Sequence, residues 1–224
     1  MTQDKSCEGR NKPILREIKE IFSAQKNVIN KRLMEFEKVG QGENNEIFTE
    51  LVFCILTPQA KAKTCWYVVL NLKKKGLLFD GDTSRIAQDI AACRFKNKKA
   101  SYIVKARKVF SNNGKSNIKS KLERASDGYA LRGWLVQNVK GFGYKEASHF
   151  MRNIGLGENL AILDRHILKN LYLLGVIEEI PKSLPVVRYL DIEKKMRKFA
   201  IKTGIPMSHL DLVLWFKETG EIFK

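Results

Sequence analysis

The chain has 224 residues, 44% of them hydrophobic, so it can bury a sizeable core in one large domain or two small ones. A total of 41 Lys and Arg against 24 Asp and Glu gives a formal net charge of +17. This excess favours an anionic partner, nucleic acid before a membrane surface, unless it only marks a basic exterior. With no long apolar span and no signal peptide, we expect a soluble intracellular protein and exclude a membrane-spanning one.

Helical periodicity dominates the chain. The first dozen residues are polar and are expected to be loosely ordered, and residues 38–46 and 111–117 are expected to be turns or loops. Apolar residues recur at the spacing of a helix face in six stretches: 45–56, 57–76, 97–110, 129–139, 164–175 and 208–220. No convincing alternating strand is present. The sequence therefore predicts an all-α protein of about ten helices.

Several helix ends carry recognisable signals. Thr57 and Pro58 resemble a helix start, and Asp164 is expected to cap the helix that follows it. Ser208 and Asp211 have the spacing of a capping box. The glycine-punctuated connector after residue 152 is the best candidate for a domain boundary.

The 4 cysteines and 3 histidines lack the spacing of a metal site. No two cysteines form a C-x-x-C pair, so neither a zinc site nor an iron–sulfur cluster is expected. Cys54 and Cys65 lie in apolar runs and are expected to be buried thiols. We expect no metal and no cofactor.

The stretch VKGFGYKEASHF at residues 139–150 reads as a tight turn that enters a helix. Gly141 and Gly143 can both adopt positive φ, and the helix is expected to begin near Tyr144. Amides at such a helix start can bind a phosphate, which would anchor the DNA backbone without reading its sequence. The alternative is an ordinary helix–helix connection whose glycines allow close packing.

This stretch resembles the helix–hairpin–helix motif of the base-excision DNA glycosylases, which reads hydrophobic-x-Gly-hydrophobic-Gly. The resemblance places Gly141, Phe142 and Gly143 on the DNA backbone. In members with lyase activity a catalytic lysine stands two positions after the second glycine, where this chain has Lys145. A catalytic aspartate begins the next helix, and Asp164 matches it 19 residues later.

Three further segments extend the resemblance to residues 44–224. LTPQAKAKT at 56–64 is similar to a superfamily helix junction whose glutamine enters the duplex, which implies that role for Gln59. CRFKNKKASYI at 93–103 and the closing DLVLWFKETGEIFK resemble archaeal-type 8-oxoguanine DNA glycosylase/AP lyases. Because no cysteine follows Cys93, the iron–sulfur cluster of endonuclease III-like relatives is not expected.

The resemblance implies a Schiff-base mechanism. Lys145 would attack C1′ as a neutral amine, its pKa lowered by burial and by Lys140 and Arg165, and Asp164 would stabilise an oxocarbenium-like sugar. The alternatives are that Lys145 only contacts a phosphate and that Asp164 only caps its helix. The basic run at residues 96–108 is expected to face DNA, or else to be a solvated helix face.

Base recognition is also implied. The lesion would be flipped out of the duplex, with Gln59 filling the vacated space. Trp215 would stack on the base and Phe95 would cover its other face, although an aromatic residue at helical spacing is usually core. Lys224 ends the sequence, and its carboxylate would read the purine edge. An acceptor for the N7 hydrogen is expected near residues 39–46. His166 is expected to be structural.

We therefore expect a two-lobed helical helix–hairpin–helix fold with the active site in a cleft between the lobes. The N-terminal helix of residues 1–43 would pack with a C-terminal lobe of residues 157–224. The other lobe would span residues 44–156 and end in the hairpin motif of about 131–154. The expected function is excision of 8-oxoguanine from double-stranded DNA, with strand cleavage by a monomer in the cytoplasm or nucleoid. The alternatives are a glycosylase for another lesion and a non-catalytic DNA-binding module.

Overall fold

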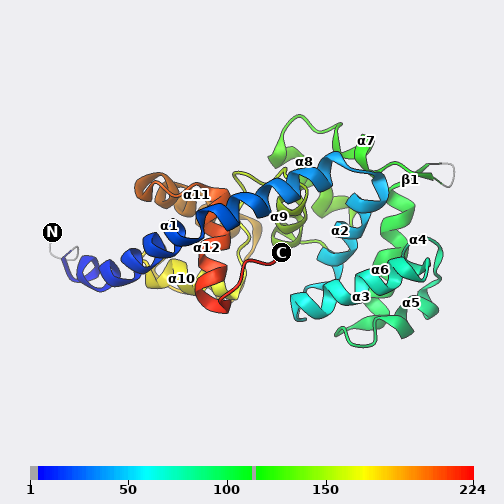
Figure 1. Ribbon diagram of the computed structural model, residues 1–224, viewed down its shortest axis with the longest axis horizontal. Coiled ribbons are helices and arrows are strands. Elements are labelled where there is room, and N and C mark those ends of the chain that lie inside the picture. The colour runs from blue at the N-terminus through cyan, green and yellow to red at the C-terminus, as the bar shows by residue number, and fades with distance from the viewer. Residues whose placement is uncertain (1–4, 113–114) are drawn as a thin grey trace. The chain divides into compact units, whose positions relative to one another are not determined.

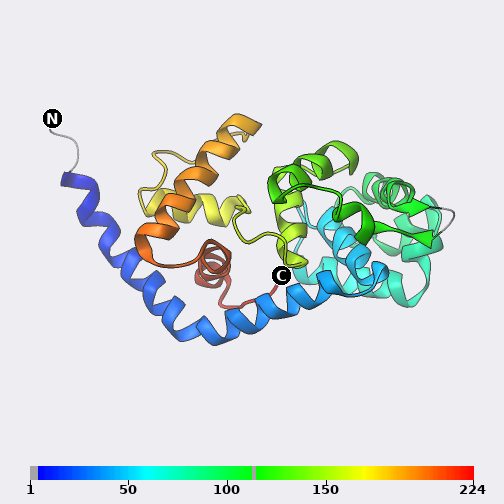
Figure 2. The same ribbon diagram turned by 90° about the horizontal axis from the view of Figure 1, so that it is seen from above.

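The computed structural model describes residues 5–112 and 115–224, which form two compact units (Figures 1 and 2). Unit 1 contains the chain up to Glu35 together with Gly157–Phe223. Unit 2 contains Phe36–Leu156 and, separately, Lys224.

The all-α class is confirmed: the described residues form twelve helices and one pair of two-residue strands. The helices are α1 (Lys5–Gln41), α2 (Asn44–Leu56), α3 (Ala62–Lys74), α4 (Leu77–Asp80), α5 (Thr83–Asp89), α6 (Lys96–Val109), α7 (Ile118–Leu122), α8 (Gly128–Asn138), α9 (Tyr144–Asn153), α10 (Arg165–Leu173), α11 (Val186–Thr203) and α12 (Met207–Thr219). The antiparallel strands are β1 (Ser111–Asn112) and β2 (Lys115–Ser116).

Helix α2 is the centre of unit 2. Glu43 and Glu46 form a capping box at its start, and all ten residues from Ile47 to Leu56 are buried. The neighbours that bury it are α3, α6, α7 and α9. A helix buried on every side is the core of its unit, so polar side chains that it carries must find partners inside. Cys54 and Cys65 are buried free thiols, as predicted; the Cys7 side chain lies outside the described residues.

Unit 1 gathers α10, α11 and α12 beside the first part of α1 (Figures 1 and 2). Asn30 on α1 contacts His209 on α12 at 2.7 Å, and the ring of Phe22 meets that imidazole edge-on at 5.7 Å. The C-terminal helix is therefore fixed to α1 by side chains far apart in sequence. No helix among the described residues has both the length and the apolar character needed to cross a bilayer.

Two predictions about α1 are wrong. The helix already includes residue 5, where loose structure was predicted, and it continues to Gln41, four residues into the predicted 38–46 loop. The last three residues of that loop belong to α2. Gly40 explains the continuation: a Cβ there would lie 2.1 Å from the Ile154 carbonyl oxygen. The glycine therefore serves close packing against the end of α9 rather than a turn.

Two predicted helix starts are also wrong. Helix α3 begins at Ala62, because Thr57 instead closes α2 by donating its hydroxyl to the Cys54 carbonyl at 3.1 Å. Helix α12 begins one residue before Ser208, with Pro206 in the capping position. The Ser208 hydroxyl contacts its neighbour His209 at 3.2 Å, so the predicted capping box does not form.

Candidate active site

The glycine turn joins α8 to α9 as a tight hairpin in unit 2. Gly141 has φ of +93°, and a Cβ there would meet the ring of Tyr102 at 2.6 Å. Both glycines were predicted to be able to adopt positive φ. Gly143 has φ of −102°, so only Gly141 uses the left-handed region. Helix α9 begins at Tyr144, as predicted.

Buried side chains pack against the hairpin and hold it in place. Arg132 on α8 is 1% exposed, donates to the Ser148 hydroxyl at 3.2 Å and lies 4.9 Å from the centre of the Tyr144 ring. Phe142 is buried with its ring 6.1 Å from that of Phe150. The Phe142 side chain thus belongs to the core, and any DNA contact of the hairpin falls to its backbone.

Lys145 is the second residue of α9. Its side chain is 25% exposed, and its ammonium lies 3.0 Å from one carboxylate oxygen of Glu146. The other oxygen of Glu146 accepts from the Gly143 N–H at 3.1 Å. One carboxylate therefore joins the hairpin backbone to the candidate nucleophile. Sequence reasoning missed Glu146, although an acidic residue three positions after a cap was the signal for it.

Lys145 shares one face of α9 with His149 and Asn153, which follow at intervals of four residues. The backbone of Lys224 lies close to the buried imidazole of His149. The Asn153 amide donates to a carboxylate oxygen of Glu50 at 3.0 Å, and the other oxygen of Glu50 pairs with the Lys224 ammonium. The helix that carries Lys145 thus also holds Lys224.

The side chain of Lys224 lies among aromatic rings. Its ammonium is 3.7 Å from the centre of the Trp66 ring and 5.9 Å from that of Phe53. Only 10% of the Lys224 side chain and 3% of the Glu50 side chain are exposed. Glu50 was missed, although an acidic residue inside the apolar run of α2 is unusual enough to mark it.

His149 predicts a pH dependence of stability. Burial lowers its pKa well below the ordinary 6.5, and the cations of Arg152 and Lys145 lower it further. The folded protein keeps the ring neutral while the unfolded chain protonates it, so this contribution is present above pH 6.5 and is lost as the pH falls. Denaturant titrations at a series of pH values measure this effect. Below pH 6.5, the free energy of unfolding of the unmodified protein should fall by about 1.4 kcal/mol more per pH unit than that of His149→Gln. Equal slopes would contradict a neutral His149.

Asp164 caps α10 in unit 1, as predicted. One of its carboxylate oxygens accepts from the backbone N–H groups of His166 and Ile167, each at 2.8 Å. The segment before it is pinned at Ala161, whose N–H donates to Glu193 at 2.8 Å and whose carbonyl accepts from the Tyr189 hydroxyl at 2.6 Å. The capping role and a catalytic role are compatible, because amides at a helix start fix the direction of the carboxylate.

Trp215 lies on α12 in the same unit and is half-buried rather than part of the core. The ring of His166 meets it edge-on at 5.3 Å, and Glu218 holds that imidazole at 3.5 Å. The Trp215 indole nitrogen is buried and has no hydrogen-bond partner among the described residues.

Gln59 and Phe95 each have a strained backbone conformation. They are the two non-glycine residues with positive φ, +56° and +61°, in the part of the chain that the structure describes. Phe95 is also 50% exposed, which is unusual for a large aromatic side chain. Strained and exposed positions of this kind concentrate at binding sites. From the sequence, both residues were predicted to contact DNA.

Comparison with known proteins identifies the family. A family model described as 8-oxoguanine DNA glycosylase matches residues 29–205, more than half of the chain. The chain belongs to this family. A relative from Fusobacterium nucleatum named 8-oxoguanine DNA glycosylase/AP lyase is 45% identical over 93% of this chain and 96% of its own. A relative of the same name from Methanocaldococcus jannaschii is 37% identical over 94% and 99%.

Solved structures of family members agree. The crystal structure of the Methanocaldococcus jannaschii 8-oxoguanine DNA glycosylase has a TM-score of 0.86 and 35% identity, covering 98% of this chain and 100% of that one. Its complex with a 15mer DNA containing 8-oxoguanine has a TM-score of 0.85 and 36% identity, covering 94% and 99%. The helix–hairpin–helix glycosylase fold is thereby confirmed.

In the present protein, Lys99 supports the loop between α2 and α3 that carries Gln59. It is 4% exposed and donates to the carbonyls of Leu56 and Pro58 at 2.7 and 2.8 Å, and burial lowers its pKa. This residue therefore corrects the prediction that the whole basic run faces DNA. Its position in that run gave no signal of burial.

Removing the Lys99 ammonium should free the loop. Lys99→Met leaves the Leu56 and Pro58 carbonyls without their donor, so we expect a loss of about 1–3 kcal/mol in stability and weaker binding to lesion duplex. Thermal unfolding and fluorescence anisotropy measure the two effects. Lys98→Met, on the exposed side of α6, is the control: it removes one surface charge, so it should lower affinity only modestly and leave stability unchanged. Equal effects from the two variants would contradict the anchoring role.

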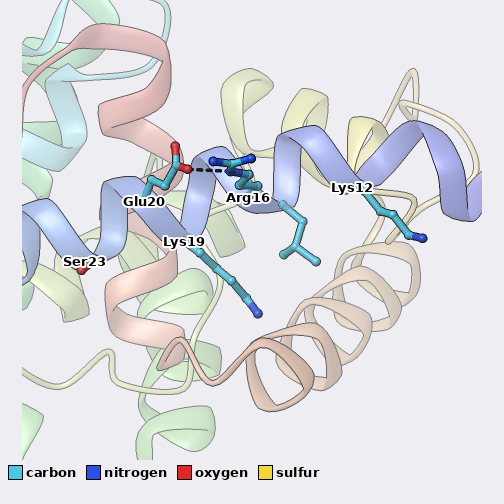
Figure 3. A pocket seen from close by; sticks show the side chains of 6 residues that line it. Lys12, Arg16, Lys19, Glu20 and Ser23 are labelled. Carbon is cyan, nitrogen blue, oxygen red and sulfur yellow. Dashed lines mark hydrogen bonds and ion pairs between the residues drawn. The ribbon is translucent and has the colours of Figure 1, made fainter.

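Two hollows in the described part of the chain are lined by none of the individually predicted site residues. A shallow pocket of about 410 Å³ lies along α1, where Lys12 and Lys19 point to one side and Arg16 pairs with Glu20 at 2.8 Å (Figure 3). A cavity of about 530 Å³ in unit 2 lies among the end of α1, α7, α8 and the end of α9. Lys145 and Asp164 are instead positioned by helix starts, and Gln59 and Phe95 by strained turns.

Proposed function

We propose that this chain excises 8-oxoguanine from duplex DNA and cuts the strand at the resulting site by β-elimination. The observation that carries the proposal is the position of Lys145, two residues after the hairpin, on the face of α9 that also holds Lys224. The names of the relatives and the DNA-bound Methanocaldococcus structure support the substrate.

The chemistry begins with Lys145. After losing a proton, its amine attacks C1′ of the damaged nucleotide, and the N-glycosidic bond breaks as the base leaves with the bonding electrons and takes up a proton. Asp164 stabilises the positive charge that develops on the sugar. Ring opening then gives an imine between Lys145 and C1′. Loss of a C2′ proton expels the 3′ phosphate, and hydrolysis of the imine releases Lys145.

Four residues would read the extruded nucleotide and its partner. Gln59, presented on its strained turn, fills the vacated space in the duplex. Trp215 stacks on the base, with the exposed Phe95 on its other face. Lys224 contacts the purine edge through its backbone oxygen atoms. An acceptor for the N7 hydrogen in residues 39–46 stays a prediction.

The hairpin would hold the DNA backbone. Glu146 already accepts from the Gly143 N–H, so a phosphate would bind other amides at the α9 N-terminus. Exposed lysines at positions 96, 98, 105 and 108 of α6 add positive charge. Affinity should therefore fall steeply with salt. The chain would act as a monomer on DNA inside the cell.

A panel of duplexes tests the proposal under single-turnover conditions. The panel contains 8-oxoguanine opposite cytosine, an oxidised pyrimidine opposite adenine, a preformed abasic site and undamaged DNA. We expect base release and strand cleavage on the 8-oxoguanine duplex and cleavage of the abasic one. Base release only from the oxidised pyrimidine would establish a glycosylase for another lesion. Binding to all four without cleavage would establish a non-catalytic DNA-binding module.

A further inference from the structure

We propose that Glu50 is a positioning residue that sets base selectivity by fixing Lys224 in the recognition site. The proposal rests on the proposed function, and specifically on the contact of Lys224 with the base. It assigns a role to a buried acidic residue of α2 that the reaction chemistry itself does not use.

The environment of Glu50 requires an explanation. Its side chain is 3% exposed in the centre of unit 2, where an ionised carboxylate is costly unless it is fully paired. The pairing is complete on both sides: Asn153, which is 0% exposed, donates to one oxygen at 3.0 Å, and the Lys224 ammonium pairs with the other. A single apolar residue would satisfy this position more simply if core packing were its only role.

The partner of Glu50 is the unusual feature. A lysine side chain ordinarily stays in water. Lys224 instead has 90% of its side chain covered, with its ammonium over the Trp66 ring at 3.7 Å. The backbone of the same residue lies beside the buried His149 ring. Glu50 and Trp66 thus hold the Lys224 side chain while its backbone faces His149, which limits the positions that the Lys224 oxygen atoms can take.

Helix α9 relates this arrangement to the chemistry. Lys145, His149 and Asn153 lie on one face of it, so the residue that would attack C1′ and the residues that hold Lys224 share one rigid element. A base recognised at Lys224 would then have its sugar presented to Lys145. Loss of the Glu50 carboxylate should misplace Lys224 while the hairpin and Lys145 stay in position.

The prediction is a selective loss of activity. Glu50→Gln keeps the shape and an acceptor for Asn153 but loses the charge that holds Lys224. We expect base release from the 8-oxoguanine duplex to fall about 10–100-fold, the range typical of residues that orient a primary contact. Cleavage of the preformed abasic duplex, which has no base to recognise, should be unchanged.

Three further variants make the test decisive. Lys224→Met should reproduce the selective loss, and the double variant should be no worse than the more affected single variant, because both remove one interaction. Thr49→Val is the matched control: it removes a buried hydroxyl that donates to the Asn45 carbonyl at 2.6 Å on the same helix. This control should leave the ratio of the two activities unchanged.

The outcomes separate the proposal from the proposed function. If the unmodified protein does not release 8-oxoguanine, the proposed function fails. If it does, equal loss of both activities in Glu50→Gln, additive losses in the double variant, or full activity would each overturn the role of Glu50. Should Glu50→Gln fail to fold in a thermal melt, the selectivity of Lys224→Met decides the question alone.

Discussion

A Lys145→Gln variant should lose the covalent protein–DNA adduct that borohydride traps from the unmodified protein on an 8-oxoguanine:cytosine duplex. The amide cannot form an imine with C1′, so strand cleavage should fall by more than about 10³-fold. Binding should change little, because the hairpin amides and the 3.1 Å bond from the Gly143 N–H to Glu146 remain when the ammonium that pairs with the other oxygen of Glu146 is lost. Denaturing gels with labelled DNA measure adduct and cleavage together.

Lys140→Gln provides the matched control. Lys140 is an exposed lysine of the same hairpin, so its loss removes one positive charge without removing the proposed nucleophile. We expect a modest decrease in affinity and normal trapping. An adduct that persists in Lys145→Gln would show that another amine forms the imine and that Lys145 serves only as a phosphate contact.

An Asp164→Asn variant should separate catalysis from capping. Asparagine caps helices about as well as aspartate, so thermal stability should change by less than about 0.5 kcal/mol. The amide carries no charge to stabilise the developing oxocarbenium ion, so base release should fall by about 10²–10³-fold. Single-turnover release of 8-oxoguanine and a thermal melt give the two quantities.

Asp127→Asn is its control, because Asp127 caps α8 with the same geometry. One of its oxygens accepts from the N–H groups of Tyr129 and Ala130, each at 2.8 Å, as Asp164 does from its own helix. Asp127→Asn should therefore match Asp164→Asn in stability and retain full activity. If the two variants had equal activity, Asp164 would be a helix cap alone.

The sequence by itself determined the helical class, the hairpin and the cap at Asp164. These features depend on short-range physics: helical spacing of apolar residues, a glycine that accepts φ of +93°, and a carboxylate next to free amides. The family resemblance added the roles of Lys145 and Gln59, which spacing alone could not supply. Gly40 was wrongly taken as part of a loop, because a turn and a close approach of two backbones both require glycine.

Only the tertiary structure decided which charged residues are buried and what they hold. Lys99 looks like an ordinary basic position of its helix, and the apolar run around Glu50 marks that residue as unusual but does not identify its partners. Each is at most 4% exposed, with partners more than 40 residues away. Such pairs form because a charge taken out of water must find an opposite charge or hydrogen bonds wherever the fold brings them. That requirement is non-local, so it leaves no periodic pattern in the sequence.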